Sequence, residues 1–200
     1  MVVYVSHRGI KNRENTINGI LKAAMIADIV ELDVRFNTNH DVILCHDREY
    51  RNVEDNETLE ELCKSEQPME LMIDIKAFGI LPAITIAQTV VSIVCKYPQH
   101  LYDLCSFNEF CVSELLRLRG ENSIPCKIGV ITSGIPLNMF DNLKNIDFVS
   151  LEYNIICEDI VELFHQREKS IYAWTVNALE MQEYVVGKCK VDGIIFDIFD

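Results

Sequence analysis

The chain has 200 residues, 49% of them hydrophobic and 24% charged, which is the composition of an ordinary globular protein and excludes disordered, collagen-like and low-complexity classes. Acidic residues (31) outnumber basic residues (18), and the net charge of −13 argues against a nucleic-acid partner because an acidic surface repels polyphosphate. The length favours one domain over residues 1–200, and no apolar run reaches the roughly 18 residues of a membrane-spanning helix, so we expect no stable membrane insertion.

Short apolar runs recur along the chain, and we predict that they are β-strands. Several are apolar almost throughout, as strands buried on both faces are. In chain order they are Val2–Ser6, Ile29–Val34, Val42–Cys45, Leu71–Ile75, Leu101–Phe107, Lys127–Thr132, Phe148–Glu152, Ile171–Val176 and Gly193–Asp197. The turn-forming residues 37–41 separate the second and third runs by too few residues for a helical crossover, so these two runs are predicted to form a hairpin.

Segments with helical periodicity lie between these strands. In chain order they are Ile17–Met25, a short helix opening at Thr58, a helix over Ala83–Val94 after Pro82, Glu109–Arg119, Pro136–Leu143, Glu158–His165 and Ala178–Val186. Thr58 and Glu61 form a capping-box pattern. Gly120 and Gly187 are predicted to end the helices that precede them.

The alternation of these elements predicts the fold class. With the return strand of the hairpin set aside, eight strands alternate with seven helices, which is the pattern of an α/β protein with a TIM (β/α)8 barrel. A doubly wound open sheet is the alternative. The first strand does not lead into a Gly-rich phosphate loop, which argues against that alternative.

Cysteine usage indicates the compartment. The eight cysteines include no C-x-x-C pair, and most lie within apolar segments, so we expect free thiols in a reducing compartment. Residues Met1–Ser6 lack a basic region and a small-residue cleavage site, and they are predicted to be a strand rather than a signal peptide. Together these observations predict a cytoplasmic protein.

Acidic side chains gather where two neighbouring predicted strands end. Glu31 and Asp33 lie two residues apart and therefore share one face of their strand, and Asp74 with Lys76 repeats this spacing on the next parallel strand. In a barrel this face is the interior, and catalytic sites lie at the carboxyl ends of the strands. Three converging carboxylates repel one another unless a cation joins them, and an oxygen-only set suits Mg²⁺ or Ca²⁺.

Histidines and cations complete this predicted site. His7 and His46 follow strand ends, and two histidines that flank a metal match a general acid and a general base. Arg8 and Lys76 are the nearby cations and could bind an anion such as phosphate. Trp174, at the end of the seventh barrel strand, either lines the site or fills the core.

The ordered set of these motifs resembles the glycerophosphodiester phosphodiesterases over residues 7–200. The motifs are His7-Arg8-Gly9, Glu14-Asn15-Thr16, Glu31-Leu-Asp33-Val34, His46-Asp47, Ile75-Lys76, Ser106-Phe107-Asn108, Trp174-Thr175-Val176-Asn177 and 192–197. The resemblance implies a TIM barrel that hydrolyses glycerophosphodiesters, as small-molecule substrates, to sn-glycerol 3-phosphate and an alcohol with one divalent cation.

The resemblance also implies a role for each matched residue. Glu31, Asp33 and Asp74 would hold the metal, and His7 and His46 would be the acid–base pair. Arg8 and Lys76 would bind the phosphate, Trp174 would line the substrate pocket, and Glu14 would support these residues without touching the substrate.

Two departures from the family pattern bear on the fold and the reaction. The family usually carries a small inserted subdomain between the His-Asp motif and the third metal strand, but only residues 48–73 fill that gap here, so we expect a compact barrel without it. Asp74 stands where the family usually has Glu, as in the related sphingomyelinase D-like phospholipases. The alternatives are therefore a phospholipase D-like lyase that forms a cyclic phosphate, or a barrel that binds a phosphodiester without turnover.

Overall fold

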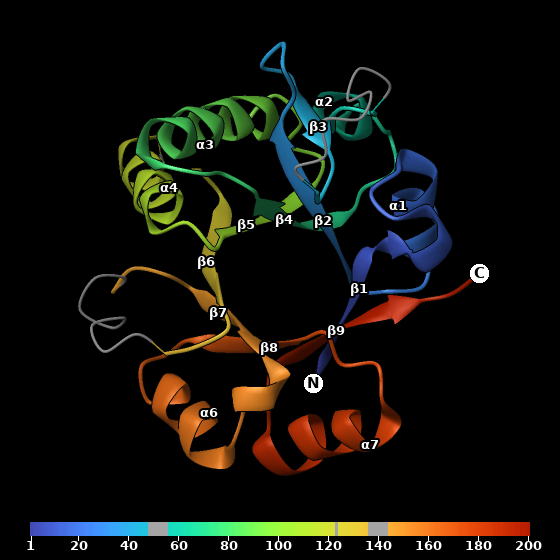
Figure 1. Ribbon diagram of the computed structural model, residues 1–200, viewed down its shortest axis with the longest axis vertical. Helices are drawn as coiled ribbons and strands as arrows, with labels where there is room; N and C mark the ends of the chain where they lie inside the picture. The colour runs from blue at the N-terminus through green and yellow to red at the C-terminus, as the bar shows by residue number, and fades with distance from the viewer. Residues whose placement is uncertain (48–55, 123, 136–143) are drawn as a thin grey trace.

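The computed structural model describes residues 1–47, 56–122, 124–135 and 144–200. Within these residues, parallel strands close into a barrel (Figure 1), because β1 (Val3–Ile10) pairs with both β2 (Ile29–Phe36) and β9 (Gly193–Ile198). From β2 the wall continues through β4 (Glu70–Ile75), β5 (Leu101–Ser106), β6 (Cys126–Thr132), β7 (Phe148–Glu152) and β8 (Ser170–Trp174) to β9. The predicted TIM barrel is confirmed, and this closure excludes the open-sheet alternative.

The predicted hairpin is also confirmed. Strand β3 (Val42–Leu44) runs antiparallel to β2, with Phe36 opposite Val42. Asn37 organises the turn, because its side-chain oxygen accepts hydrogen bonds from the backbone N–H groups of Asn39 and Asp41 at 2.9 and 2.8 Å.

Helices surround the barrel (Figure 1). Their bounds in the described chain are α1 Ile17–Ala23, α2 Leu59–Cys63, α3 Ile80–Val94, α4 Glu109–Asn122, α6 Glu158–His165 and α7 Leu179–Gln182, with short helices η1 Lys11–Arg13, η3 Tyr153–Ile155 and η4 Glu183–Cys189. The capping box at α2 is present, because Thr58 Oγ1 accepts from the N–H of Glu61 while the Glu61 carboxylate accepts from the N–H of Thr58. The helix predicted at 136–143 lies outside the described residues.

Three predicted helix ends are wrong. Helix α4 continues through Gly120 to Asn122, and α7 continues through Gly187 as the wider helix η4 to Cys189. A glycine within a helix lowers helix stability by only about 1 kcal/mol relative to alanine. Burial of apolar residues beyond the glycine can therefore determine where the helix ends. Helix η4, for example, ends in a left-handed residue, Lys190 (φ 67°), which is followed by buried Val191. Helix α1, in contrast, ends at Ala23 and leaves Met25 exposed.

Two aromatic rings fill the amino-terminal part of the barrel interior. The rings of Phe148 and Tyr172 meet edge to face, with their centroids 5.5 Å apart. Each lies against a glycine of a neighbouring strand, since a Cβ atom added at Gly129 or Gly193 would come within 2.3 Å of Phe148 or 2.6 Å of Tyr172. The interior is thus packed at this end, and the opening lies at the carboxyl ends of the strands.

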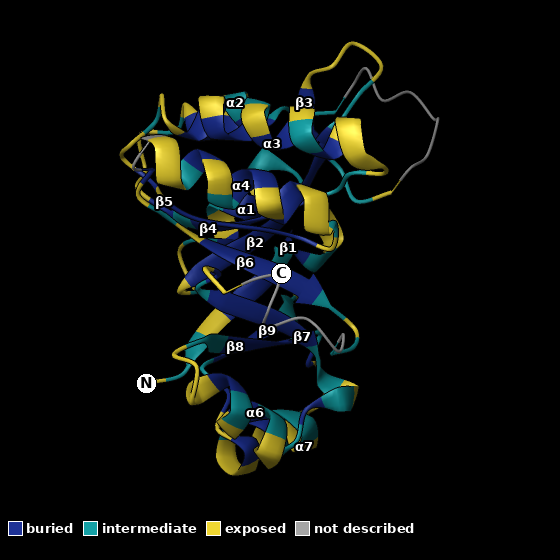
Figure 2. Ribbon diagram, turned by 90° about the vertical axis from the view of Figure 1, so that its left-hand side faces the viewer, coloured by how far each residue is buried: buried dark blue, intermediate teal, exposed yellow. Residues whose placement is uncertain are grey.

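The outer faces of the strands form a second apolar layer against the helices. Figure 2 shows the barrel wall as buried and places exposed residues mainly on the outer faces of the helices. This packing holds the strand ends, and the side chains that they carry, in fixed positions. No helix in the described part of the chain is long and apolar enough to cross a membrane.

Candidate active site

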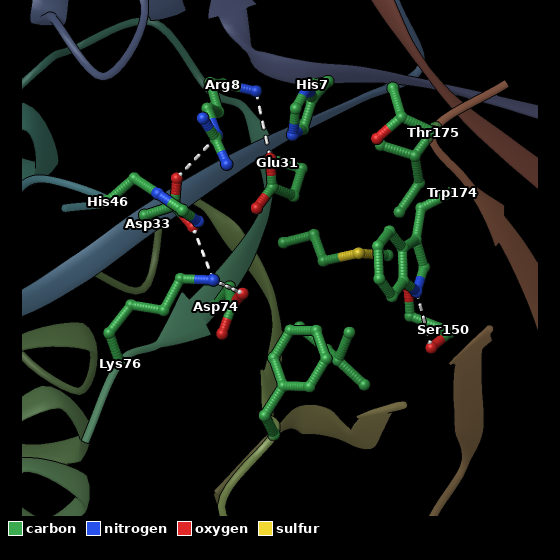
Figure 3. Close-up of a pocket in the computed structure, with 14 residues that line it drawn as sticks. His7, Arg8, Glu31, Asp33, His46, Asp74, Lys76, Ser150, Trp174 and Thr175 are labelled. Carbon is green, nitrogen blue, oxygen red and sulfur yellow. Dashed lines mark hydrogen bonds and ion pairs between the residues drawn. The ribbon is translucent and has the colours of Figure 1, made fainter. Parts of the chain in front are cut away.

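The predicted site residues meet in one cavity of about 140 Å³ at the carboxyl ends of the strands. Its lining includes His7, Arg8, Glu31, Asp33, His46, Asp74, Lys76 and Trp174. Figure 3 shows the charged side chains on one side of the cavity and Trp174 on the other. Glu14 is not among the lining residues.

Three carboxylates form the base of the charged side. Asp33 on β2 stands opposite Asp74 on β4 in the strand register, and Glu31 lies two residues before Asp33 on the same face. All three are buried, and one oxygen from each lies within 4.8 Å of the others. Asp74 Oδ1 accepts no hydrogen bond from any described residue. This oxygen-only set, with an unused buried oxygen, fits a hard divalent cation.

Burial and mutual repulsion make this cluster hard to ionise without a cation. Burial first, and then the negative charges of Asp33 and Asp74, raise the pKa of Glu31 well above its ordinary value. Burial by itself also raises the pKa of Asp33, but the positive charges of Lys76 and Arg8 outweigh it, so this pKa lies below its ordinary value. Glu31 is therefore the carboxylate whose ionisation depends most on added positive charge.

Two cationic side chains, Arg8 and Lys76, form ion pairs with the carboxylates. Lys76 Nζ lies 3.0 Å from Asp33 Oδ1 and also bonds to Asp74 Oδ2. Burial lowers the pKa of Lys76, but these two carboxylates outweigh burial and raise it to about 12, so the ammonium stays charged. Arg8 Nε lies 2.9 Å from Asp33 Oδ2, and the backbone N–H of Arg8 donates to Glu31 Oε2 at 3.0 Å.

A carboxylate that the sequence analysis did not assign orients His7. Asp197 Oδ1 lies 2.7 Å from His7 Nδ1, and Asp197 Oδ2 accepts from Asn177 Nδ2 at 2.9 Å and pairs with Lys11 Nζ at 3.1 Å. With Nδ1 engaged, Nε2 is the ring nitrogen available to the cavity. Strand alternation could have found Asp197, because it lies two residues after Ile195, which lines the same cavity.

His46 is held in a more open place. It follows β3 at the rim, with 40% of its side chain exposed, and its Nδ1 lies 2.7 Å from Asp47 Oδ1. Asp47 is itself 70% exposed. The two histidines therefore differ: His7 is bonded to a carboxylate whose side chain is 7% exposed, and His46 to one that is mostly in solvent.

The residues after β1 support the site from outside the cavity. Asn15 exchanges two hydrogen bonds with Asp33, one to its carboxylate and one from its backbone N–H, both 2.9 Å. The sequence assigned no separate role to Asn15. The next residue, Thr16, caps helix α1. Glu14 pairs with Lys11 Nζ at 2.7 Å and with Arg8 Nη1 at 3.4 Å. Glu14 thus lies behind Arg8.

The cavity also has an apolar lining. Its residues are Met72, Phe107, Ile131, Trp174 and Ile195. Trp174 lies across the cavity from the charged side chains (Figure 3), whereas Met72 stands beside Glu31 in the strand register. The ring of Trp174 is fixed on two sides: its Nε1 donates to the carbonyl of Ser150 at 3.0 Å, and it meets Phe107 edge to face at 5.7 Å. Of these residues, the sequence indicated a site role only for Trp174.

Comparison with known proteins supports the architecture. No protein-family profile matches the chain, and no curated protein is similar in sequence. Solved structures do match. One is a glycerophosphodiester phosphodiesterase from Parabacteroides distasonis, with 18% identity and a TM-score of 0.80 over 98% of this chain and 92% of that one. Another is a glycerophosphodiester phosphodiesterase from Thermotoga maritima, with 22% identity and a TM-score of 0.74 over 98% of this chain and 94% of that one. A phosphodiesterase from Oleispira antarctica, in complex with the product sn-glycerol-3-phosphate, also matches, with 15% identity and a TM-score of 0.80 over 97% of this chain and 92% of that one.

This chain has the fold of the glycerophosphodiester phosphodiesterases. A chitinase from Ipomoea carnea matches as well, with 10% identity and a TM-score of 0.57. The barrel by itself therefore does not define the reaction, which has to be argued from the site.

Proposed function

We propose that this protein is a metal-dependent phosphodiesterase that hydrolyses glycerophosphodiesters to sn-glycerol 3-phosphate and an alcohol. The observation that carries the proposal is the meeting of three buried carboxylates, two cations and two histidines at one cavity. The enzyme names of the structures with the same fold support it. One of them holds a product with a phosphate and a glycerol.

Charge balance supports both the metal and the anionic substrate. With Glu31, Asp33 and Asp74 ionised, three negative charges face the positive charges of Arg8 and Lys76, which leaves one negative charge. A bound Mg²⁺ or Ca²⁺ would turn this into one positive charge, which a phosphodiester anion would neutralise. When bound, the ion would supply Lewis-acid stabilisation of the negative phosphoryl oxygens.

Arg8 and Lys76 are the residues that we expect to bind the phosphate. Both line the cavity while their positions are fixed by Asp33. Cations held in place before the substrate arrives stabilise developing negative charge without reorganising. An arginine fork and a lysine point charge both suit phosphate oxygens.

The two histidines divide the proton transfers in this proposal. Burial lowers the pKa of His7 below its ordinary value of 6.5, although Asp197 acts in the opposite direction, so at pH 7 the ring is neutral and its Nε2 can take the proton of the attacking water. His46, at the open rim, would donate a proton to the oxygen of the departing alcohol as the P–O bond breaks. Such acid–base catalysis contributes about 10²–10⁴-fold to a rate.

We place the protein in the cytoplasm on the evidence of its thiols. All eight cysteines are free, and four of them, Cys63, Cys105, Cys111 and Cys189, are buried. Free thiols in such number suit a reducing compartment.

The test is an assay of glycerophosphocholine with Mg²⁺, with Ca²⁺ and with EDTA, followed by phosphorus NMR. Hydrolysis gives sn-glycerol 3-phosphate and requires a metal. A cyclic glycerol phosphate would instead support the lyase alternative that Asp74 suggests, and no product with either metal would support a binding protein without turnover.

Matched variants connect the activity to the site. His46→Asn should lower kcat by about 10²-fold or more, while His40→Asn, at the hairpin turn outside the cavity, should leave kcat unchanged. Equal activity in the two variants would refute the role of His46.

A further inference from the structure

Arg35 has a buried side chain with no carboxylate partner among the residues that the structure describes. Its relative exposure is 9%, and its Nε atom is buried without a hydrogen-bond partner in that part of the chain. The partly buried guanidinium groups of Arg8 and Arg119, in contrast, each pair with a carboxylate. Arginine does not lose its proton in proteins, and an unpaired buried charge is costly. Such an arginine is a candidate for binding an anion that the chain itself does not supply.

Strand alternation places Arg35 on the inner face of β2. Glu31 and Asp33 face the barrel interior, and Arg35 is the next residue on their side of the strand. Val34 and Phe36, on the other side, pack in the apolar layer against the helices. Arg35 is not among the residues that line the cavity. Two residues of strand rise about 6–7 Å, so Arg35 lies that much nearer the barrel mouth than Asp33.

An aromatic ring holds the guanidinium without occupying its N–H donors. The central guanidinium carbon of Arg35 lies 5.9 Å from the centre of the Phe78 ring, which belongs to the connection from β4 to α3. A cation–π contact of this kind involves the face of the ring. The N–H donors of a guanidinium lie in its own plane, so this contact positions the group while leaving its fork able to bind an anion.

The position of Arg35 matches the alcohol end of the substrate. His46, to which we assign protonation of the departing alcohol, follows β3, and β3 pairs with β2 so that Ile43 stands opposite Arg35. The alcohol therefore leaves the phosphate on the side of the mouth that β2 and β3 form. Arg35 also adds one positive charge to a site whose metal, carboxylates, cations and phosphodiester would otherwise sum to zero. One carboxylate would neutralise this charge, whereas a phosphate monoester carries about 1.5 to 2 negative charges.

We propose that Arg35 determines substrate specificity by binding a carboxylate on the alcohol part of the substrate, so that the substrate class includes glycerophosphodiesters of hydroxy acids such as serine. This inference rests on the proposed function. For such a substrate, water adds to phosphorus, the P–O bond to the alcohol breaks, and the products are sn-glycerol 3-phosphate and the hydroxy acid. The guanidinium fork matches the two oxygens of a carboxylate. Choline, ethanolamine and inositol carry no carboxylate, so all three leave Arg35 unpaired.

The kinetic experiment compares glycerophosphoserine with glycerophosphoethanolamine, because their alcohols differ by one carboxylate. Wild type should prefer the serine diester by about tenfold in kcat/KM, which is what a hydrogen bond to a charged group contributes. Arg35→Gln should bring this ratio to one or below, and Arg35→Lys, which keeps the charge but loses the fork, should keep part of it. Arg117→Gln removes an equal charge from an exposed side chain of α4 and should keep the full ratio. A wild-type ratio of one, or the wild-type ratio in Arg35→Gln, would overturn the proposal.

A binding measurement separates this proposal from the proposed function. Calorimetry with phosphoserine and phosphoethanolamine in the presence of Mg²⁺ should show about tenfold tighter binding of phosphoserine, and Arg35→Gln should remove the difference. If that result comes without turnover of any diester, the role of Arg35 is supported and the hydrolase is refuted. Equal binding of the two phosphates, or binding of neither, contradicts the role of Arg35.

Thermal unfolding distinguishes an arginine kept for a ligand from one that serves the fold. Arg35→Gln removes a buried charge, and the Tm of this variant should equal or exceed that of wild type, because no internal ion pair is lost. Arg119→Gln removes the partner of Asp147 and should lower the Tm. A Tm of Arg35→Gln as low as that of Arg119→Gln would show that Arg35 pairs within the chain, and the proposal would then be wrong.

Discussion

Replacing Asp103 with asparagine should stabilise the protein at neutral pH and have little effect at pH 4. Asp103 lies on β5, is 2% exposed, and its Oδ2 atom accepts no hydrogen bond from any described residue. Its nearest cation, Lys127 Nζ, is 3.6 Å away on a half-exposed side chain. Burial raises the pKa of Asp103 to about 6 from an ordinary value of 3.8, because Lys127 compensates only part of the desolvation.

The magnitude and sign follow from the protons bound in each state. Between pH 3.8 and about 6 the folded state holds a proton that the unfolded state has released, so stability falls as the pH rises through this window. A difference of about two pKa units corresponds to about 3 kcal/mol at pH 7. Asparagine carries no charge at any pH, and it gives up only a weak, partly solvated ion pair worth about 0.5 kcal/mol.

Urea unfolding of wild type and Asp103→Asn at several pH values between 4 and 7.5 measures this effect. The stability of the variant relative to wild type should increase by about 3 kcal/mol across the range. Asp159→Asn, an exposed aspartate of α6, is the control and should show no such trend. A difference between Asp103→Asn and wild type that stays constant with pH would refute the reasoning.

Four further predictions concern the site and the thiols. Saturating Mg²⁺ or Ca²⁺ should raise the melting temperature by stabilising the native state about 2.7 kcal/mol at 100 times Kd, and Asp33→Asn should abolish the rise; identical melting curves in EDTA and in excess Mg²⁺ would disprove the metal site. Asp197→Asn should lower kcat about tenfold or more and move the acidic limb of the pH profile to lower pH, because the Asp197 bond raises the pKa of His7; an unmoved limb would contradict the assignment. Choline, ethanolamine and inositol diesters of glycerol phosphate should differ in kcat/KM by less than about tenfold, since a small open cavity has few buried groups to leave unpaired; a hundredfold preference would be incompatible with this. All eight cysteines should react with a thiol reagent after denaturation without reductant, and fewer than about six free thiols would indicate an oxidising compartment.

The strands could be predicted because their burial on both faces requires apolar residues at successive positions of the sequence. Runs such as Phe148–Glu152 and Gly193–Asp197 are mostly apolar, which is typical of parallel strands that are covered on both faces, as in a barrel wall. The same alternation places Glu31 and Asp33 on one face. For this reason the charged side of the cavity was predicted from local spacing together with strand order.

Features that depend on contacts between distant segments could not be predicted this way. Asn15 reaches Asp33 from a loop whose left-handed backbone (φ 53°) no local pattern indicates. The helix ends at Gly120 and Gly187 were wrong because packing beyond the glycine overrides its local preference. Asn108 joins the loop after β5 to the loop after β4 through the carbonyls of Ala77 and Gly79, and no local pattern indicates this contact.

The junction between β1 and β9 has a consequence for the order in which the site can form. The three carboxylates lie on β2 and β4, within residues 29–75, whereas the bond from His7 to Asp197 spans 190 positions. Pairings between such distant residues form late, since closing a long loop costs entropy before any contact is made. A chain folding from its amino terminus during synthesis can therefore gather its metal ligands early. The imidazole of His7 acquires its carboxylate partner only when the barrel wall is complete, so a partly folded intermediate could bind a cation while lacking a competent base.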